Sequence, residues 1–220
     1  SGYLARMDLP AGAVNLILGG RTLGDHLVRN DVFRKVSFMG SSASGLAVAQ
    51  LCAQRFARVT LELGGKSSAI LLDDVDFTKV KKQLWLAMLQ NNGQVCGAQS
   101  RVLIPKSRAP ELRLALREMF EETVVGDPRS PETGIGPVVT AVAANRIRNT
   151  CKEATSQGAV LVSGTAEELE ESASVPPRLY EVEDSVADVW NEELFGPVAC
   201  LRVYETEDEA VGWANQSRYG

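Results

Sequence analysis

The sequence predicts an α/β protein built on a largely parallel sheet, and three observations lead to this prediction. Short apolar runs alternate along the chain with stretches of helical periodicity, the pattern of strand–helix–strand units with right-handed crossovers. The 220 residues are 45% apolar and 23% charged, an ordinary composition for a globular protein with a sizeable core. No apolar run approaches the roughly 18 residues of a membrane span, and the first residues lack the basic head and apolar core of a signal peptide.

The expected elements of the first half follow from these two periodicities. Apolar runs bounded by glycine or charged residues predict strands, and longer periodic stretches predict helices. The expected strands are 13–18, 34–38, 58–63, 69–72 and 101–104, and the expected helices are 22–29, 45–56 and 76–90. In the last of these helices Leu84 and Met88 share one face, and Asp76 is placed to cap the first turn.

The second half continues the same alternation. Helices are expected at 110–122, 141–156 and 207–216, and strands at 159–162, 179–182 and 198–203. The last helix begins with Thr206 followed three residues later by Glu209, the spacing of a capping box. The acidic run 167–171 is expected to be a solvated surface.

Charge is spread unevenly along the chain. Residues 1–110 hold 14 Lys and Arg against 7 Asp and Glu, a net of +7, whereas residues 111–220 have a net of −12. The two halves can simply attract each other, or the basic half can attract an anionic ligand such as a dinucleotide. An overall charge of −5, without a basic arm, argues against nucleic acid as a partner.

The histidine and cysteine content limits which kinds of catalytic or metal site the chain can hold. The single histidine, His26, argues against a histidine-dependent triad or a multi-histidine metal site, so no metal is expected. The four cysteines, Cys52, Cys96, Cys151 and Cys200, form no Cys-x-x-Cys pair. They therefore indicate neither a zinc ribbon nor a disulfide scaffold, and favour a reducing, cytoplasmic setting. Any chemically special cysteine must act as a lone nucleophile.

Three segments carry residues suited to chemistry. The first is Phe38-Met39-Gly40-Ser41-Ser42-Ala43-Ser44-Gly45, where a strand leads through a glycine-bounded turn into a helix. The backbone of such a turn can approach a phosphate, and a helix N-terminus favours negative charge. The same spacing also fits an ordinary tight turn, so both interpretations stay open on this segment alone.

The second segment, Leu61-Glu62-Leu63-Gly64-Gly65-Lys66, holds the only glutamate of the first 110 residues. Apolar and glycine neighbours would desolvate the Glu62 carboxylate, as a general base near neutral pH requires. Simple strand alternation would instead point Glu62 to solvent between Leu61 and Leu63, and on this segment alone that interpretation is preferred.

The third segment is Asn91-Asn92-Gly93-Gln94-Val95-Cys96-Gly97, a polar loop between a helix and a strand. Cys52 and Cys200 lie inside apolar runs, whereas Cys96 lies in a loop, where function concentrates. With no histidine nearby, activation of this thiol must come from a carboxylate, from backbone dipoles or from a bound cationic cofactor.

Taken together, these segments resemble motifs of the aldehyde dehydrogenase superfamily. The run 62–66 is similar to the family's general-base motif, and Gly93-Gln94-Val95-Cys96 is similar to its nucleophile motif. The run Glu193-Leu194-Phe195-Gly196-Pro197-Val198 is similar to its cofactor-binding motif. The turn 38–45 is similar to its glycine-bounded turn, with Met39 in place of threonine. The similarity extends over essentially the whole chain.

The resemblance implies a fold and a mechanism. The chain would hold parts of two Rossmann-like parallel-sheet domains, with residues 1–64 from the cofactor-binding domain and 65–220 from the catalytic domain. The implied reaction is the oxidation of a small-molecule aldehyde with NAD or NADP. Cys96 would add to the aldehyde, hydride would pass to the cofactor, and Glu62 would activate the water that releases a carboxylic acid.

The resemblance also implies the cofactor contacts. Glu193 would bind the nicotinamide ribose with Phe195 beside it, and the backbone of Leu63 would face the carboxamide. The glycine-bounded turn would face the pyrophosphate through Gly40, Ser41 and Gly45.

Family members carry further chain on both sides of the matching region, so the sequence is expected to be a central fragment. A Rossmann-type sheet cut midway exposes an edge and a face, and we expect the isolated chain to be inactive and poorly folded. The full-length parent is expected to be a homo-oligomer. Neither the aldehyde nor the choice between NAD and NADP follows from these residues.

Two other functions remain open. In a CoA-acylating relative, CoA instead of water would take the acyl group, and Glu62 argues against this because such a reaction needs no water-activating base. In a non-catalytic interaction scaffold of the same fold, neither Cys96 nor Glu62 would be needed, and the presence of both argues against it.

Overall fold

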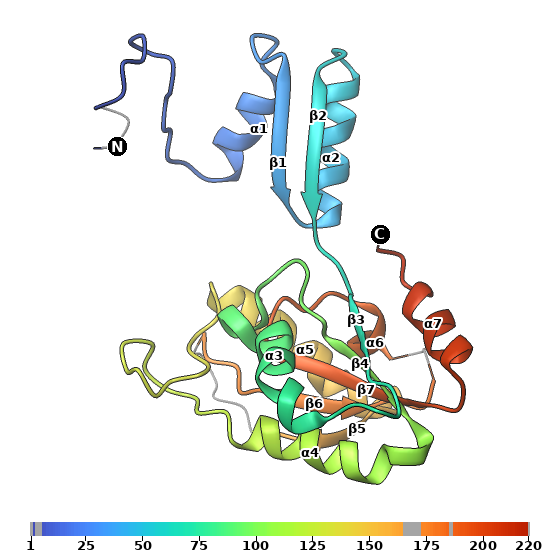
Figure 1. Ribbon diagram of the computed structural model, residues 1–220. Coiled ribbons are helices and arrows are strands. Elements are labelled where there is room, and N and C mark those ends of the chain that lie inside the picture. Colours follow the sequence, from blue (N-terminus) through green and yellow to red (C-terminus); the bar gives the residue numbers. More distant parts are fainter. Residues whose placement is uncertain (1, 3–5, 165–172, 185–186, 220) are drawn as a thin grey trace. The chain divides into compact units, whose positions relative to one another are not determined.

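The computed structural model describes residues 2, 6–164, 173–184 and 187–219. The chain forms two compact units, Ser1–Leu63 and Gly64–Gly220, which we describe separately (Figure 1). The division falls one residue before the boundary expected from the sequence.

The first unit is a strand–helix–strand arrangement preceded by one further helix. In chain order its elements are α1 (Arg21–Arg29), β1 (Lys35–Gly40), α2 (Ser42–Ala53) and β2 (Arg58–Leu63). The two strands are parallel and pair from Lys35 with Arg58 to Gly40 with Leu63, so their carboxyl ends lie together. The helix α2 packs on both strands, and α1 packs on α2.

Residues 13–18, expected as a buried strand, form no strand. All six are exposed, and in the described part of the unit β1 and β2 pair only with each other. An apolar run becomes a strand only where a neighbour accepts its backbone hydrogen bonds, and residues 13–18 pair with no strand in the described part of the unit.

The second unit is built on a five-stranded sheet with the order β3-β4-β7-β6-β5. The strands are β3 (Ser68–Ile70), β4 (Arg101–Pro105), β5 (Val160–Ser163), β6 (Arg178–Glu181) and β7 (Val198–Tyr204). The pairs β3–β4, β4–β7 and β6–β7 are parallel, whereas β5 pairs antiparallel with β6. The expectation of a largely parallel sheet is confirmed, with β5 as the exception at one edge.

The described part of the second unit contains five α-helices. They are α3 (Phe77–Leu89), α4 (Ala109–Glu121), α5 (Ala141–Ser156), α6 (Asp188–Asn191) and α7 (Glu207–Asn215). Short 3₁₀ turns at Gln90–Gly93 and Lys106–Arg108 complete the set. The expected helices are confirmed within three residues at each end in both units. The four-residue helix α6 was not predicted, because it is too short to show a period.

The sequence predicted helix caps at Thr206 and Asp76, and the structure contains the first but not the second. The Thr206 hydroxyl accepts a hydrogen bond from the Glu209 N–H at 3.2 Å, and the Glu209 carboxylate accepts one from the backbone of Glu205. Asp76 precedes α3 but makes no cap to the helix backbone. Its carboxylate accepts instead from the Thr78 hydroxyl at 2.6 Å.

The core of the second unit lies on both faces of the sheet. One cluster contains Ile147 of α5, Trp190 of α6 and Tyr180 of β6, and the other contains Leu89 of α3 and residues of α4. Successive residues of each strand alternate between the clusters, as the pleat requires. Helices therefore cover the sheet on both sides (Figure 1), which suits a mainly parallel sheet.

Three expectations concern whole-chain properties. The acidic run 167–171 lies outside the described residues. In the part of the chain that the structure describes, no helix is long and apolar enough to cross a membrane. The same part contains no group of three His, Cys, Asp or Glu side chains arranged to hold a metal ion.

Candidate functional site

The glycine-bounded turn and the end of β2 come together in the first unit. Gly40 and Leu63 are register partners at the carboxyl ends of their strands. Ser41 is the N-cap of α2, and its hydroxyl accepts a hydrogen bond from the Ser44 N–H at 3.3 Å. A β-carbon on Gly45 would overlap the Leu63 side chain, so glycine allows the helix to lie close to the strand. Ligands of open α/β sheets bind at this end of the strands.

Glu62 lies one residue before Leu63 and pairs with Met39 of β1. Its side chain is exposed, whereas Leu61 and Leu63 are half-buried. The interpretation preferred from this segment, in which strand alternation points Glu62 to solvent, is confirmed, and the carboxylate is not desolvated by its neighbours in the chain. Glu62 and Cys96 belong to different units.

The loop that carries Cys96 begins where α3 ends, and we refer to residues 90–99 as the Cys96 loop. Asn91, Asn92 and Gly93 have left-handed backbone with φ values of 53°, 59° and 70°. Gln99 closes the loop by donating its N–H to the carbonyl of Ala87 at 2.9 Å.

Cys96 differs from the other three cysteines in exposure. Its side chain is exposed, whereas Cys52, Cys151 and Cys200 are buried, and none of the four forms a disulfide. A small electrophile can therefore reach Cys96 far more easily than the other three thiols.

A second loop, residues 192–197, carries Glu193 and Phe195, and we refer to it as the Glu193 loop. The Glu193 carboxylate is half-buried against the backbone of Gly64 and accepts a hydrogen bond from the Gly65 N–H. Burial raises the pKa of this carboxyl group, while the Gly65 N–H and the cations of Arg146 and Lys66 oppose the rise. Phe195 has a left-handed backbone, with φ of 54°, and an exposed side chain.

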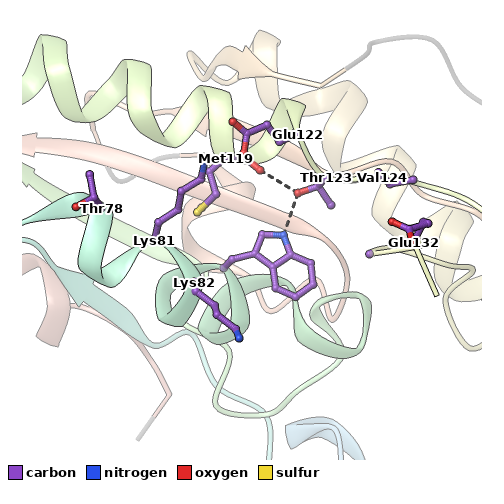
Figure 2. Close-up of a pocket in the computed structure, with 10 residues that line it drawn as sticks. Thr78, Lys81, Lys82, Met119, Glu122, Thr123, Val124 and Glu132 are labelled. Carbon is purple, nitrogen blue, oxygen red and sulfur yellow. Dashed lines mark hydrogen bonds and ion pairs between the residues drawn. The ribbon is translucent and has the colours of Figure 1, made fainter.

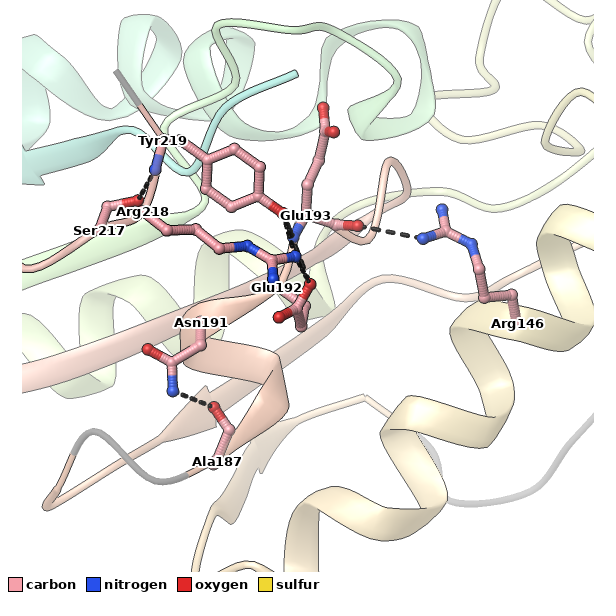
Figure 3. A network of polar contacts seen from close by, with 8 residues as sticks. All are labelled: Arg146, Ala187, Asn191, Glu192, Glu193, Ser217, Arg218 and Tyr219. Atoms are coloured by element: carbon pink, nitrogen blue, oxygen red, sulfur yellow. Dashed lines mark hydrogen bonds and ion pairs between the residues drawn. The ribbon is translucent and has the colours of Figure 1, made fainter. Parts of the chain in front are cut away.

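Distant residues fix the main chain of Glu193 on both sides (Figure 3). Arg146 of α5 donates to the carbonyl oxygen of Glu193 at 3.1 Å and to that of Leu194 at 2.7 Å. The Glu193 N–H donates to the Tyr219 hydroxyl at 3.3 Å. Arg218 in turn donates to both the Tyr219 hydroxyl and the Glu192 carboxylate. The position of the Glu193 backbone is thus set by residues 26 and 47 positions away in the chain.

The glycine pair Gly64-Gly65 contacts both loops. A β-carbon on Gly64 would overlap the Glu193 carboxylate, and one on Gly65 would lie 2.9 Å from the carbonyl oxygen of Cys96. A small hollow at this junction is lined by residues of all three segments, among them Gly65, Val95 and Phe195. The second unit therefore brings the Cys96 loop and the Glu193 loop together on one glycine segment.

A larger surface groove lies elsewhere in the second unit, between α3 and the end of α4 (Figure 2). Several of its polar groups are paired with one another. The Trp85 indole N–H donates to the Thr123 hydroxyl at 2.9 Å, and Lys81 pairs with Glu122 at 2.6 Å. None of the candidate residues lines this groove, so its size does not make it the functional site.

Comparison with known proteins now decides the family. Residues 2–220 match the sequence model described as the aldehyde dehydrogenase family. The chain belongs to the aldehyde dehydrogenase family. The resemblance and the α/β fold class expected from the sequence are both confirmed.

Curated proteins similar in sequence to this chain are named as dehydrogenases. Geranial dehydrogenase of Castellaniella defragrans is 36% identical over 216 residues, which are 98% of this chain and 45% of that protein. The 3-succinoylsemialdehyde-pyridine dehydrogenase of a Pseudomonas species is 35% identical over 218 residues, which are 97% of this chain and 46% of that protein. The chain thus spans about half the length of the curated aldehyde dehydrogenases it matches.

Solved structures of aldehyde dehydrogenases are similar in fold to this chain. Aldehyde dehydrogenase of Mycobacterium tuberculosis, complexed with NAD⁺, has a TM-score of 0.91 and 34% identity, over 97% of this chain and 44% of that one. A mutant aldehyde dehydrogenase C of Pseudomonas syringae, complexed with NAD⁺ and octanal, has a TM-score of 0.84 and 34% identity, over 90% of this chain and 41% of that one.

Sequence reasoning did not find every residue of the site. Arg146 carries no local signal, because its partners lie 47 and 48 residues away and its helix is ordinary. The left-handed turn does have a signal, since Asn-Asn-Gly is the composition that tolerates positive φ. The contact of Tyr219 with Glu193 depends on the tertiary fold alone.

Proposed function

We propose that this chain supplies the nucleophile, the base and part of the cofactor site of an NAD(P)-dependent aldehyde dehydrogenase that oxidises an aldehyde to a carboxylic acid. The observation that carries the proposal is the convergence of the Cys96 loop and the Glu193 loop on Gly64-Gly65. Solved relatives are complexed with NAD⁺ or NADP⁺, and one of them also with octanal, which supports both the cofactor and the substrate class.

Cys96 is the residue suited to attack. Its thiolate adds to the aldehyde carbon, forming a C–S bond and a tetrahedral alkoxide, and the Cys96 backbone N–H is a donor for that oxyanion. Loss of hydride from the same carbon leaves a thioester on Cys96. Exposure of this thiol supports the assignment, because the other three cysteines are buried away from substrate.

The residues present fit a dinucleotide. When bound, a nicotinamide cofactor supplies the hydride acceptor. The end of β1, the N-terminus of α2 and the exposed Ser41 would take the pyrophosphate, because helix N-termini favour anions. Glu193 would accept hydrogen bonds from the nicotinamide ribose, with Phe195 beside it. The backbone of Leu63, at the same strand ends, would face the carboxamide.

Glu62 is the group we assign to deacylation. Its exposed carboxylate takes a proton from water, the resulting hydroxide adds to the thioester carbon, and the C–S bond breaks. A carboxylic acid leaves and the Cys96 thiolate is restored. Four free cysteines also support a reducing, cytoplasmic setting for this chemistry.

The test is a cysteine comparison in the intact protein, with reduced nicotinamide followed by absorbance. Cys96→Ala is expected to lower kcat by about 10³-fold or more, since removal of a covalent nucleophile typically has this effect. The matched control is Cys52→Ala, which removes a buried thiol and is expected to change kcat by less than about twofold. A Cys96→Ala enzyme with wild-type kcat would overturn the proposal.

Glu62→Gln separates the two half-reactions. The variant is expected to release one equivalent of reduced cofactor in a burst and then turn over slowly, because the thioester forms but is not hydrolysed. A variant with an unchanged steady state would remove Glu62 from the mechanism. The same assay with CoA present detects the acylating alternative, in which acyl-CoA replaces the acid as product.

A further inference from the structure

The Cys96 loop adopts an unfavourable backbone. Asn91 and Asn92 are consecutive non-glycine residues with left-handed φ and ψ, followed by Gly93 with φ of 70°. Asparagine adopts left-handed backbone more readily than most residues, but it does so as a single residue and seldom twice in succession. The loop therefore depends on contacts that favour this conformation over a relaxed one.

The Asn92 carboxamide makes two of these contacts with one neighbouring segment. Its Nδ2 donates to the carbonyl oxygen of Pro137 at 2.9 Å, and its Oδ1 accepts from the Gly136 N–H at 2.8 Å. Both ends of the amide are thus used on the backbone of a segment 44 and 45 residues further along the chain. A side chain with only a donor or only an acceptor could not make both bonds.

Gln94 makes a third contact with the same segment. Its Oε1 accepts from the Val139 N–H at 2.8 Å, and its Nε2 donates to the carbonyl oxygen of Asn91 at 3.2 Å. The Gln94 side chain therefore connects the start of the Cys96 loop to the backbone of Val139. The Asn91 side chain, by contrast, donates within the loop, to the carbonyl oxygen of Gln94.

The segment that receives these bonds is itself tied to the core, and we refer to residues 136–139 as the support segment. The Val138 N–H donates to the carbonyl of Ala173 at 2.8 Å, and Pro137 forms an isolated bridge with Ser174. Val138 is 3% exposed and belongs to the cluster that contains Trp190. Because its backbone is fixed, the support segment can fix whatever bonds to it.

Cys96 lies two residues beyond Gln94, on a short span that ends at the backbone bond from Gln99 to Ala87. We propose that Asn92 and Gln94 are positioning residues for the nucleophile: their side-chain amides fix the Cys96 loop on the support segment and so set where the thiolate meets the substrate. The inference rests on the proposed function, because Cys96 must be the nucleophile for its placement to matter. Displacement of a reacting group by about 1 Å can lower a rate by about 10²-fold.

The chain offers variants that separate the side-chain bonds from backbone strain. Asn92→Gly removes both bonds to the support segment and leaves a residue that accepts left-handed backbone without cost. Asn91→Gly is the matched control, since Asn91 has nearly the same φ and its side chain donates inside the loop, not to the support segment, among the described residues. Gln94→Ala removes the contact with Val139, and Gln94→Glu keeps an acceptor oxygen for that N–H.

The experiment measures steady-state kinetics and iodoacetamide labelling of each variant of the intact protein. Asn92→Gly and Gln94→Ala are expected to lower kcat by about 10- to 100-fold, with KM for the cofactor changed less than about twofold. Asn91→Gly is expected to stay within about threefold of the wild-type kcat. Gln94→Glu keeps the acceptor for the Val139 N–H but loses the donor to Asn91, so its kcat is expected to lie between those of the wild type and Gln94→Ala. Labelling at Cys96 alone, with the three buried cysteines protected, shows that the fold is retained.

Hydrogen exchange gives a readout that does not depend on activity. The amide protons of Gly136 and Val139 donate to Asn92 and Gln94, so each is expected to exchange faster in the variant that lacks its acceptor. Equal kcat losses in Asn92→Gly and Asn91→Gly, or unchanged exchange at both amides, would overturn the inference. Labelling of the buried cysteines in Asn92→Gly would do the same, because the residue would then support the fold as a whole. If Cys96→Ala kept full activity while these amides exchanged faster, the proposed function would fail and the structural contact would stand.

Discussion

The backbone of Gly93 lies against the carbonyl oxygen of Gly196, so close that a β-carbon on Gly93 would overlap this oxygen. The first glycine belongs to the Cys96 loop and the second to the Glu193 loop. Gly196 is itself confined, since a β-carbon there would overlap the Ile147 side chain in the core. At this point the two loops of the candidate site therefore meet through main chain, and a side chain at Gly93 would separate them there.

Gly93→Ala is expected to damage both stability and activity. The new methyl group meets a backbone oxygen that cannot move aside, and alanine at φ of 70° adds strain. We expect the free energy of unfolding to fall by roughly 2–4 kcal/mol and kcat to fall more than tenfold. Chemical denaturation and aldehyde-dependent reduction of the cofactor measure the two effects.

The matched control for this change is Gly97→Ala, four residues further along the same loop. A β-carbon on Gly97 meets no heavy atom within 4 Å, and the residue is exposed. The control is expected to keep the wild-type free energy of unfolding within about 0.5 kcal/mol. If both alanine variants were equally stable, the close approach of the two loops would be contradicted.

Tyr219→Phe is expected to weaken cofactor binding without weakening the fold much. The variant removes the hydroxyl that accepts from the Glu193 N–H. Glu193, the proposed ribose-binding residue, thereby loses one of the two hydrogen bonds that hold its main chain. A hydrogen bond of this kind contributes about 0.5–1.5 kcal/mol, which corresponds to a rise of roughly 2- to 10-fold in Kd for the cofactor. Fluorescence titration with NAD⁺ and NADP⁺ measures the change.

Tyr204→Phe provides the comparison for Tyr219→Phe. The buried Tyr204 hydroxyl donates to the carbonyl oxygen of Leu71 at 2.7 Å, at the far end of β7 from the Glu193 loop. This variant also loses one hydrogen bond between a tyrosine hydroxyl and the main chain, and it is expected to lower stability while leaving Kd for the cofactor unchanged. A larger change in Kd for Tyr204→Phe than for Tyr219→Phe would contradict the assigned role of Tyr219.

The motifs of the site could be predicted from the sequence because each is local. The glycine-bounded turn, the β1 and β2 strands and the exposed cysteine loop are set by residues a few positions apart, where propensity and turn chemistry act. The predicted strand at 13–18 failed for the opposite reason. Its apolar residues are suitable for a strand, but a strand also needs a partner, and partners are set by tertiary structure.

The contacts that fix the site could not be predicted, since they join distant positions. Nothing in the run 141–156 indicates that Arg146 donates to the Glu193 loop, because its donors meet backbone carbonyls, which every residue carries. The antiparallel pairing of β5 is likewise absent from the local pattern. Periodicity gives the identity of an element but not its direction in the sheet.

Arg101→Lys is expected to destabilise the second unit strongly. Arg101 is 3% exposed, its guanidinium donates to the carbonyl oxygens of Lys66, Trp213 and Ala214, and it lies 5.2 Å from the centroid of the Trp190 ring. Lysine keeps the charge but cannot reach three separate acceptors with a planar fork. The free energy of unfolding is expected to fall by about 2–4 kcal/mol in a denaturant titration.

Arg117→Lys is the control for this arginine. Arg117 is exposed on α4 and pairs with Glu121 one helical turn away. Exposed pairs of this kind contribute little to stability, and lysine preserves most of that contribution. Equal stability of the Arg101→Lys and Arg117→Lys variants would mean that the C-terminal end of α7 needs no buried donor.

The raised pKa of Glu193 gives the stability of the second unit a pH dependence of known sign. A carboxyl group whose pKa is higher in the folded state binds its proton more tightly there. Its contribution to stability is fully present below the ordinary glutamate pKa of about 4.3 and is lost as pH rises through the raised value. Glu193→Gln removes this titration. The variant is expected to be more stable than the wild type at pH 8, and the difference is expected to vanish at pH 4.

Thermal unfolding of the cofactor-free protein at several pH values measures this difference, with Glu192→Gln as control. Glu192 is ion-paired with Arg218, so its replacement removes an attraction and is expected to give no gain in stability at pH 8.

For Glu193 two effects compete, because burial disfavours the carboxylate while the Gly65 N–H and the cations of Arg146 and Lys66 favour it. Burial is the larger effect in this geometry. A Glu193→Gln variant less stable than the wild type at pH 8 would reverse that order and show a carboxylate held in place by its partners.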